Sequence, residues 1–273
     1  MTALGGSSSR RSTSSTSPTD GGPETAPTET ATAALRGGFF MPGVRMQNDF
    51  ETARSFVVKE EGGYVDDPQD SGNWSSGTAG VGTLIGSNEG VGAPAAISFM
   101  RRMVTRAWMK ALPDDVHRAM FRLYWNRVGG DAMPAGLDLM LIDSGWNRGT
   151  GTAVQILQRV LSLEADGKPG PATVAAAIRP GPRPLRIGIL DVAALQAALG
   201  LEADGVAGPV TLAAWAQLGP AEALLVALYA AQVRDYRSLR QFSRYGRGWL
   251  ARTARRLAAA RAMVAAAPVA AAA

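Results

Sequence analysis

Five carboxylates crowd the eleven residues from Glu60 to Asp70, in the string EEGGYVDDPQD. Carboxylates that share one enclosed site cannot all ionise cheaply, so at least one of them is expected to have a raised pKa. Such a carboxyl can donate a proton near neutral pH, while an ionised partner supports the other side of a substrate. This pair is the minimum requirement for glycoside hydrolysis. A helix end followed by a solvated acidic turn fits the same string, and spacing alone leaves both interpretations open.

The residues before the cluster predict the helix that would position it. Asn48 or Asp49 can cap a helix that the Gly-Gly pair at 62–63 would end, and apolar residues follow at helical spacing between these limits. Glu60 and Glu61 lie on the last turn, where both can face inward. The periodicity therefore places an acid at the end of a helix without choosing which one.

A mainly α-helical fold is predicted for the rest of the chain. Residues 62–92 are rich in Gly, Asp, Ser and Thr and form a long irregular stretch, which is usually functional inside a compact domain. The segment VGTLIG within it could form part of a small hairpin. Helical patterns then follow at about 94–111, 114–128, 134–145 and 149–163.

The second half of the chain contains a duplicated unit. Residues 154–176 align without gaps on residues 192–214, and the two share the string LQxxLxLEADGxxGPxT. Each unit is typical of a helix, a tight Asp-Gly-x-x-Gly turn and a second helix opened by Pro. Asp166 and Asp204 are interpreted as turn residues, because the further carboxylates of a calcium loop are missing.

Composition excludes several classes of enzyme. The 273 residues include no Cys and one His, which rules out thiolate nucleophiles, disulfides and two-histidine metal sites. The net charge of +5 favours a polyanionic partner, such as nucleic acid, a membrane surface or a cell-wall polymer. Nine arginines lie between Arg234 and Arg261. They fit either a solvated helical face or a contact surface for an anionic polymer.

The two ends of the chain are expected to be unstructured tails. Residues 1–46 are rich in Ser, Thr and Pro without an apolar period, which is typical of disorder, and they lack the apolar core of a secretory signal. Residues 266–273 form a short Ala-rich tail. No apolar run is long enough to span a membrane, so no stable membrane insertion is expected.

Several segments resemble glycoside hydrolase family 108, a group of phage-type and bacterial N-acetylmuramidases of lysozyme-like fold with a C-terminal peptidoglycan-binding region. They are KEEGGYVDDPQDSGNW at 59–74, its continuation SSGTAGVGTLIGSNEGVG at 75–92, DLMLIDSGWNRG at 138–149 and FSRYGRGWLARTARR at 242–256. The two repeats resemble the binding part. The resemblance implies a muramidase domain at 47–133 and a helical peptidoglycan-binding region at 134–265.

The resemblance also implies roles for three residues. The acid directly before Gly-Gly-Tyr is the general acid of the family, which corresponds to Glu61. Asp70 has the spacing of the second carboxylate of phage-type lysozymes, which helps to position the attacking water. Ser87 occupies the usual position of a Thr in that family, because this chain departs from the common pattern after Asp70 and rejoins it at Gly86. Thr78 and Thr83 are alternative sources of this hydroxyl.

Other side chains could contact a glycan. Tyr64 and Trp74 could stack on sugar rings, although aromatic residues more often fill a core, and Trp74 is the stronger candidate because it lies in the loop. Thr78 and Asn147 are further candidates for substrate binding, and Asn147 could instead cap its helix. His117, on a helical pattern, is expected to be structural.

The sequence thus predicts a peptidoglycan hydrolase that cleaves the β-1,4 bond between N-acetylmuramic acid and N-acetylglucosamine, with an inverting course by analogy with phage-type lysozymes. A non-catalytic wall-binding protein and a lytic transglycosylase are the alternatives. No metal, organic cofactor or nucleic-acid partner is expected, and the protein is predicted to be a monomer. Without a visible signal peptide, it would be made in the cytoplasm and reach the wall through a holin or another non-classical route.

Overall fold

The computed structural model describes residues 49–179 and 185–267. These residues form eleven α-helices and three short 3-10 helices, and no strand is present among them. The predicted mainly α-helical fold is therefore confirmed. The predicted disordered tail at 1–46 lies outside the described residues, as does most of the predicted tail at 266–273. Within the described residues, no helix combines the length and hydropathy needed to cross a membrane.

The first part of the described chain contains one helix, an irregular segment and three further helices. Their order is α2 (Phe50–Glu61), η1 (Ser71–Asn73), α3 (Ala93–Met100), α4 (Arg106–Lys110), α5 (Asp114–Arg127) and η2 (Gly130–Ala132). The predicted helix before Gly62 and the irregular stretch at 62–92 are both confirmed. Isolated antiparallel bridges between Val65 and Ser87 and between Trp74 and Leu84 hold that stretch together.

The helical pattern at 94–111 is interrupted, which corrects the sequence prediction. Arg101 adopts a left-handed backbone conformation with φ of 51° and ends α3. Thr105 then begins α4 as its N-cap, because its side chain accepts a hydrogen bond from the backbone N–H of Trp108. The apolar residues of this segment therefore lie on two short helices.

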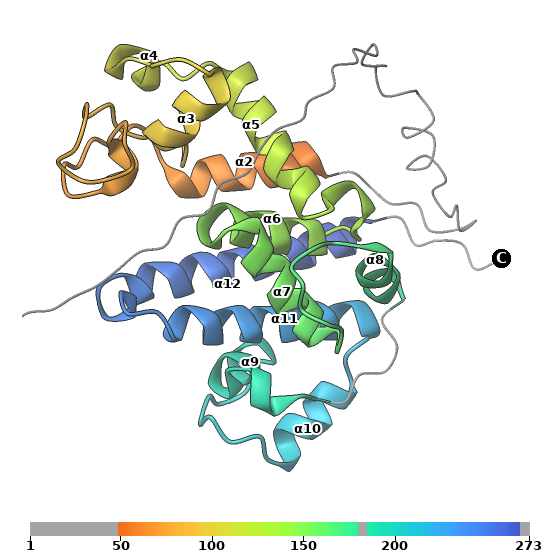
Figure 1. Cartoon of the computed structure of the whole chain (residues 1–273). Helices are drawn as coiled ribbons and strands as arrows, with labels where there is room; N and C mark the ends of the chain where they lie inside the picture. Colours follow the sequence, from red (N-terminus) through yellow and green to blue (C-terminus); the bar gives the residue numbers. More distant parts are fainter. Residues whose placement is uncertain (1–48, 180–184, 268–273) are drawn as a thin grey trace, which may run out of the picture. The chain divides into compact units, whose positions relative to one another are not determined.

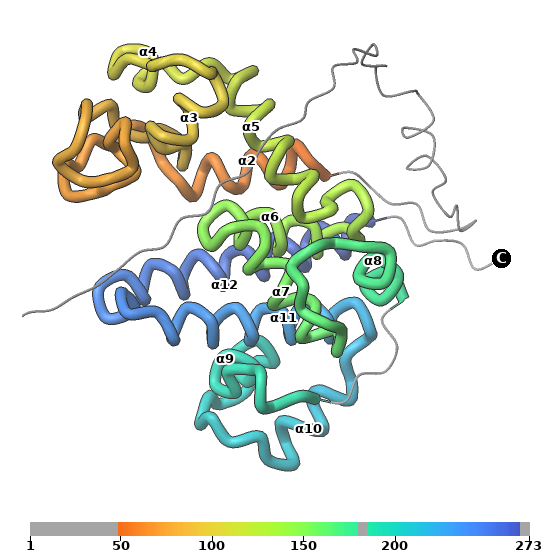
Figure 2. Tube along the Cα trace, viewed as in Figure 1, coloured from red at the N-terminus to blue at the C-terminus, as the bar shows by residue number. Residues whose placement is uncertain are grey.

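The remaining elements are helix α6, two helical hairpins, a short 3-10 helix between them and a long antiparallel pair. They are α6 (Leu137–Arg148), α7 (Thr150–Val160), α8 (Pro171–Ile178), η3 (Ile187–Ile189), α9 (Val192–Ala198), α10 (Pro209–Ala216), α11 (Pro220–Arg237) and α12 (Phe242–Ala266). Figure 1 shows α11 and α12 side by side, with α6 against α12 and α2 beyond α6. The tube in Figure 2 traces the two repeats as α7–α8 and α9–α10, whose first helices both contact α11.

The two repeats fold in the same way down to individual hydrogen bonds. The buried amide of Gln158 donates to Asp166 at 2.6 Å and to Thr173 at 3.2 Å. Gln196 donates in the same manner to Asp204 at 2.6 Å and to Thr211 at 3.1 Å. Both aspartates lie in the turns between helices, where each also accepts from a backbone N–H two residues later. Their predicted role as turn residues is confirmed.

Two apolar clusters surround the end of α2. The larger one joins α2, α5, α6, α7, α9, α11 and α12, and therefore continues across the predicted domain boundary at 133/134. The smaller one lies beneath the irregular stretch and is formed by Ile85, Val91, Ala93, Ala96, Val104, Met109 and Met120. Trp146 of α6 packs against both clusters. The last turn of α2 consequently lies near the junction of the two clusters.

Candidate active site

Glu61 is the last residue of α2, and its side chain is mostly enclosed, with 17% of its surface exposed. Val57, one turn earlier on the same face, is fully buried, which anchors that face in the core. Glu60 points to a separate partner, because its carboxylate accepts two hydrogen bonds from Arg255 at 2.7 and 2.6 Å. The two adjacent acids thus have different surroundings in the structure, whereas helical periodicity alone allowed both to face inward.

An ionic network connects Glu61 with α6 and α12. The Arg252 Nη1 atom lies 2.7 Å from Glu61 Oε1, and Arg252 Nε donates to Asp143 Oδ1 at 3.0 Å. Asp143, which is fully buried, also accepts from Arg256 Nη1 at 2.6 Å. Arg256 is equally buried and donates to Gln232 of α11. Two carboxylates and two guanidinium groups therefore balance one another inside the protein.

Burial raises the pKa of Glu61 above its ordinary value, and the negative charges of Asp143 and Glu60 add to this effect. The Arg252 guanidinium opposes the increase by favouring the ionised carboxylate. Burial outweighs it, so Glu61 holds its proton to a higher pH than a solvated glutamate does. A carboxyl in this state is suited to donate a proton as a general acid.

A tight turn covers Glu61 from the other side. Asn88 and Val91 exchange two backbone hydrogen bonds around Glu89 and Gly90, and both central residues have positive φ, as in a type I′ hairpin turn. Gly90 leaves no room for a side chain, since a Cβ atom there would lie 2.9 Å from Glu61 Cγ and 2.2 Å from Trp146 Nε1. Only glycine therefore permits this close approach to the carboxyl group.

Two side chains fix the turn in place. The Asn88 amide donates to the Met109 carbonyl at 2.9 Å, which ties the turn to α4. The ring of His117, on α5, is fully buried, and its Nε2 atom lies 3.3 Å from the Glu89 carbonyl. Burial lowers the pKa of His117, so the ring favours its neutral form. The single histidine thus lies behind the turn and is fully buried, whereas we expected from the sequence a non-catalytic residue that is half-buried or on the surface.

Two polar atoms beside this turn lack hydrogen-bond partners. Glu61 Oε1 and Trp146 Nε1 are both buried, and neither makes a well-directed hydrogen bond to a described residue. Arg252 approaches Oε1 closely, so that pairing acts through charge rather than through a directed hydrogen bond. Buried polar groups are normally satisfied, so these two atoms are among the exceptions in the described residues.

Asp70 and Ser87 lie outside this network. Asp70 is exposed and caps η1, where its side chain accepts from the Gly72 N–H at 2.9 Å. Ser87 exchanges backbone hydrogen bonds with Val65, one residue before the turn that begins at Asn88. The structure thus places Ser87 close to the turn along the chain. Their proposed roles in positioning water stay predictions.

The predicted sugar-binding residues occupy four different surroundings. Tyr64 donates its hydroxyl to the Ile85 carbonyl at 2.9 Å and packs with the smaller apolar cluster. Trp74 is half-buried, and its indole N–H donates to the Pro68 carbonyl at 2.9 Å. Thr78 is exposed in the loop. Asn147 is exposed on the last turn of α6, where its amide donates to the Asp143 carbonyl.

Sequence reasoning missed the two arginines of the network. Arg252 and Arg256 were included in the basic run that we interpreted as a solvated face or a polymer contact, yet their side chains are 12% and 0% exposed. A signal was present: Thr253, Leu257 and Ala260 form the buried stripe of α12, and Arg256 falls within it at helical spacing. Its position therefore predicted burial, which for an arginine requires carboxylate partners.

Comparisons with known proteins find one family model that matches part of the chain. Residues 54–149 match the family model described as Glycosyl hydrolase 108. Among solved structures, the chain is similar to SagA from Brucella abortus, with 27% identity and a TM-score of 0.55 over 78% of this chain and 94% of that chain. A search of curated proteins found no match. The matched segment contains Glu61 and Asp143, whereas Arg252 and Arg256 lie beyond it.

Proposed function

We propose that the chain is a peptidoglycan hydrolase of the N-acetylmuramidase type, because residues 54–149 match the model of glycosyl hydrolase family 108. The match supports a glycosidase, and the helical fold agrees with the lysozyme-like fold expected from the sequence. The proposal adds the bond: the β-1,4 linkage between N-acetylmuramic acid and N-acetylglucosamine. It also adds the residue that protonates the leaving oxygen.

The observation that carries the proposal is the enclosed carboxyl of Glu61 beneath Gly90. Its pKa is raised by burial, so it holds the proton needed by a leaving glycosidic oxygen to a higher pH than a solvated glutamate does. The buried Oε1 atom is paired in charge with Arg252 at 2.7 Å, and the Trp146 N–H beside it has no hydrogen-bond partner in the described protein.

The second half of the reaction is assigned to the irregular stretch. Asp70 is exposed and ionisable, and one of its oxygens is occupied by its capping hydrogen bond. We propose that its other oxygen, with the hydroxyl of Ser87 or Thr78, orients the attacking water. An inverting course follows if water attacks from the face opposite the acid. The anomer released first, followed by NMR during digestion, tests this assignment.

The Glu61→Gln variant tests the general acid. Glutamine keeps the shape of the side chain and removes the proton, and general acids contribute about 10²–10⁴-fold to rates. We therefore expect release of reducing ends from purified sacculi to fall by at least about 100-fold. Glu60→Gln is the matched control, because the neighbouring acid pairs with Arg255 instead, and it should keep most of the activity.

Mass spectra of the released fragments identify the bond and the chemistry. Reducing N-acetylmuramic ends support a muramidase, whereas 1,6-anhydro ends would replace hydrolysis by transglycosylation. Full activity of Glu61→Gln on sacculi would overturn the assignment of the acid. Binding of sacculi without any release of fragments by the unaltered protein would instead favour a wall-binding protein.

A further inference from the structure

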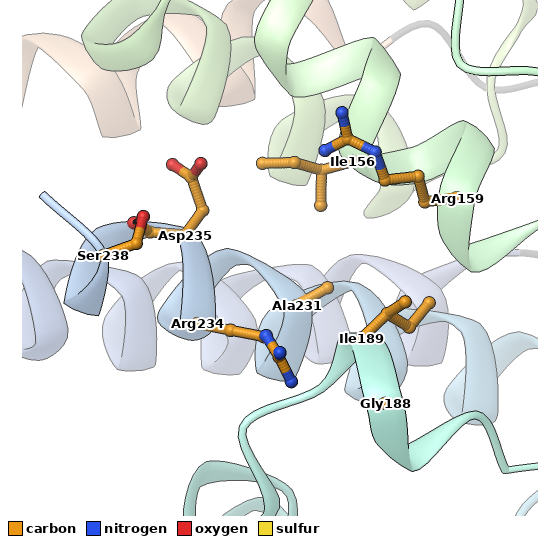
Figure 3. Close-up of a pocket in the computed structure, with 8 residues that line it drawn as sticks. All are labelled: Ile156, Arg159, Gly188, Ile189, Ala231, Arg234, Asp235 and Ser238. Carbon is orange, nitrogen blue, oxygen red and sulfur yellow. Dashed lines mark hydrogen bonds between the residues drawn. The ribbon is translucent and has the colours of Figure 1, made fainter.

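A pocket of about 310 Å³ lies between α7, η3 and α11, away from Glu61 and its network. Figure 3 shows side chains from all three elements around it. Its lining includes Ile156 and Arg159 of α7, Ile189 of η3, and Ala231, Arg234 and Asp235 of α11. The pocket thus joins the first repeat to the long helix α11, on which both repeats pack.

The pocket carries a surplus of positive charge. Arg159 is exposed, and no hydrogen bond or ion pair engages its guanidinium group among the described residues. Arg234 uses one nitrogen on the Leu190 carbonyl, at 3.3 Å, and keeps its remaining N–H groups. The one acid in the lining, Asp235, is paired with Arg148 at 2.8 Å. Two guanidinium groups on opposite walls are therefore available to an anion.

The wall between the two arginines is apolar. Ile156 and Ala231 are 4% and 7% exposed, and Ile189 is half-buried. A ligand that fits this lining has separated anionic groups joined by short aliphatic segments. A short peptide with carboxylate side chains and alanine methyl groups meets this description, because guanidinium groups pair well with carboxylates. A polymer of repeated phosphates offers charge without the apolar segments.

We propose that this pocket binds the peptide stem of peptidoglycan, with Arg159 and Arg234 pairing its carboxylates. The inference rests on the proposed function, which supplies the polymer. Helix α6 connects the pocket with the candidate active site, since Asp143 contacts the Glu61 network and Arg148, further along the same helix, contacts Asp235.

Calorimetric titration of the full chain with soluble wall fragments tests the pocket. The first probe is a disaccharide that carries a tetrapeptide stem, and the second is the same disaccharide without its peptide. Arg159→Gln is the test variant, because loss of this exposed guanidinium breaks no interaction among the described residues. Arg247→Gln is the matched control, since it removes an exposed arginine of α12 outside the pocket.

We expect the unaltered protein to bind the peptide-bearing fragment at least about tenfold more tightly than the bare disaccharide. Arg159→Gln should lose most of this preference, and Arg247→Gln should keep it. Digestion of peptide-free glycan strands should be the same for all three proteins, which separates this test from that of the active site. Equal affinity for both fragments, an unchanged preference in Arg159→Gln, or tighter binding of a phosphate-rich wall polymer would each overturn the proposal.

Discussion

The Arg252→Met variant tests whether Glu61 depends on its cationic partner. The Arg252 side chain is 12% exposed and lies between Glu61, which is 17% exposed, and Asp143, which is fully buried. Methionine keeps the aliphatic packing of the side chain and removes its charge. Asp143 retains Arg256 as its partner, whereas the Glu61 carboxylate is left enclosed without a cation. The variant therefore isolates the charge that acts on Glu61.

Removing one partner of a buried ion pair typically lowers the free energy of unfolding by about 3–5 kcal/mol. Because Glu61 keeps some contact with solvent, the lower end applies, and we expect a loss of about 3 kcal/mol in the free energy of unfolding at pH 7. For domains of this size, each kcal/mol corresponds to a few degrees in the melting temperature. The melting temperature should therefore fall by roughly 6–12 °C.

The size of this loss should depend on pH. Without Arg252, nothing opposes the effect of burial, so the pKa of Glu61 rises further than in the unaltered protein. Above this pKa the enclosed carboxylate is ionised and disfavours folding, while below it the side chain is neutral. The difference in stability between the two proteins should consequently be smaller at pH 5 than at pH 7.

Thermal melts at both pH values and a pH profile of kcat/KM measure the two effects. The alkaline limb of the profile reports the pKa of the general acid, so it should move to higher pH in Arg252→Met. Arg118→Met is the control, because Arg118 joins Glu51 at the same 2.7 Å while both side chains are more than half exposed. Arg118→Met should lower the free energy of unfolding by less than about 1 kcal/mol. An unmoved alkaline limb in Arg252→Met would refute the link between this arginine and the acid.

Two further predictions concern other positions. Gly90→Ala should lower activity by more than about tenfold, because its Cβ would displace the acid and the indole beneath it. Gly80→Ala is the control, because Gly80 has φ of 79° and open space around it; it should lose only about 1 kcal/mol in the free energy of unfolding and keep its activity. Lysis assays and thermal melts of both variants measure the two effects. Burial raises the pKa of Asp138 to about 7. Its folded pKa thus exceeds the unfolded value of 3.8, so stability is lost as pH rises from about 4 through 7. Asp138→Asn should remove this dependence in urea denaturation at pH 5 and 8.5, and equal pH dependence in both proteins would contradict it.

Features set by local sequence were predictable. The Gly-Gly pair after Glu61 predicted the end of α2, and the repeated Asp-Gly turns predicted two equal hairpins. In each hairpin the buried glutamine, Gln158 or Gln196, makes the same set of hydrogen bonds, so the shared string determines the shared structure. These features depend on residues within about fifteen positions of one another, where turn chemistry and helix periodicity decide the conformation.

Features that depend on distant partners were not predictable from spacing. The surroundings of Glu60 and Glu61 differ in which arginine of α12 each acid meets, and nothing near residue 60 contains that information. The unbroken helical pattern at 94–111 concealed a left-handed residue, Arg101, because an arginine carries no composition signal for that conformation. In both cases tertiary packing decided between options that local sequence left open.

The matched segment at 54–149 contains only part of the Glu61 network. That segment contributes Glu61 and Asp143, both enclosed and both acidic, while the cations that balance them come from α12. An uncompensated charge in such surroundings costs several kcal/mol, a large part of the stability of a typical domain. The packing of α12 on α6 therefore supplies the cations that balance the enclosed acid beneath Gly90. The arginines of α12 thus fall into two groups: Arg252 and Arg256 on its buried face pair with Glu61 and Asp143, and others, such as Arg247, are exposed.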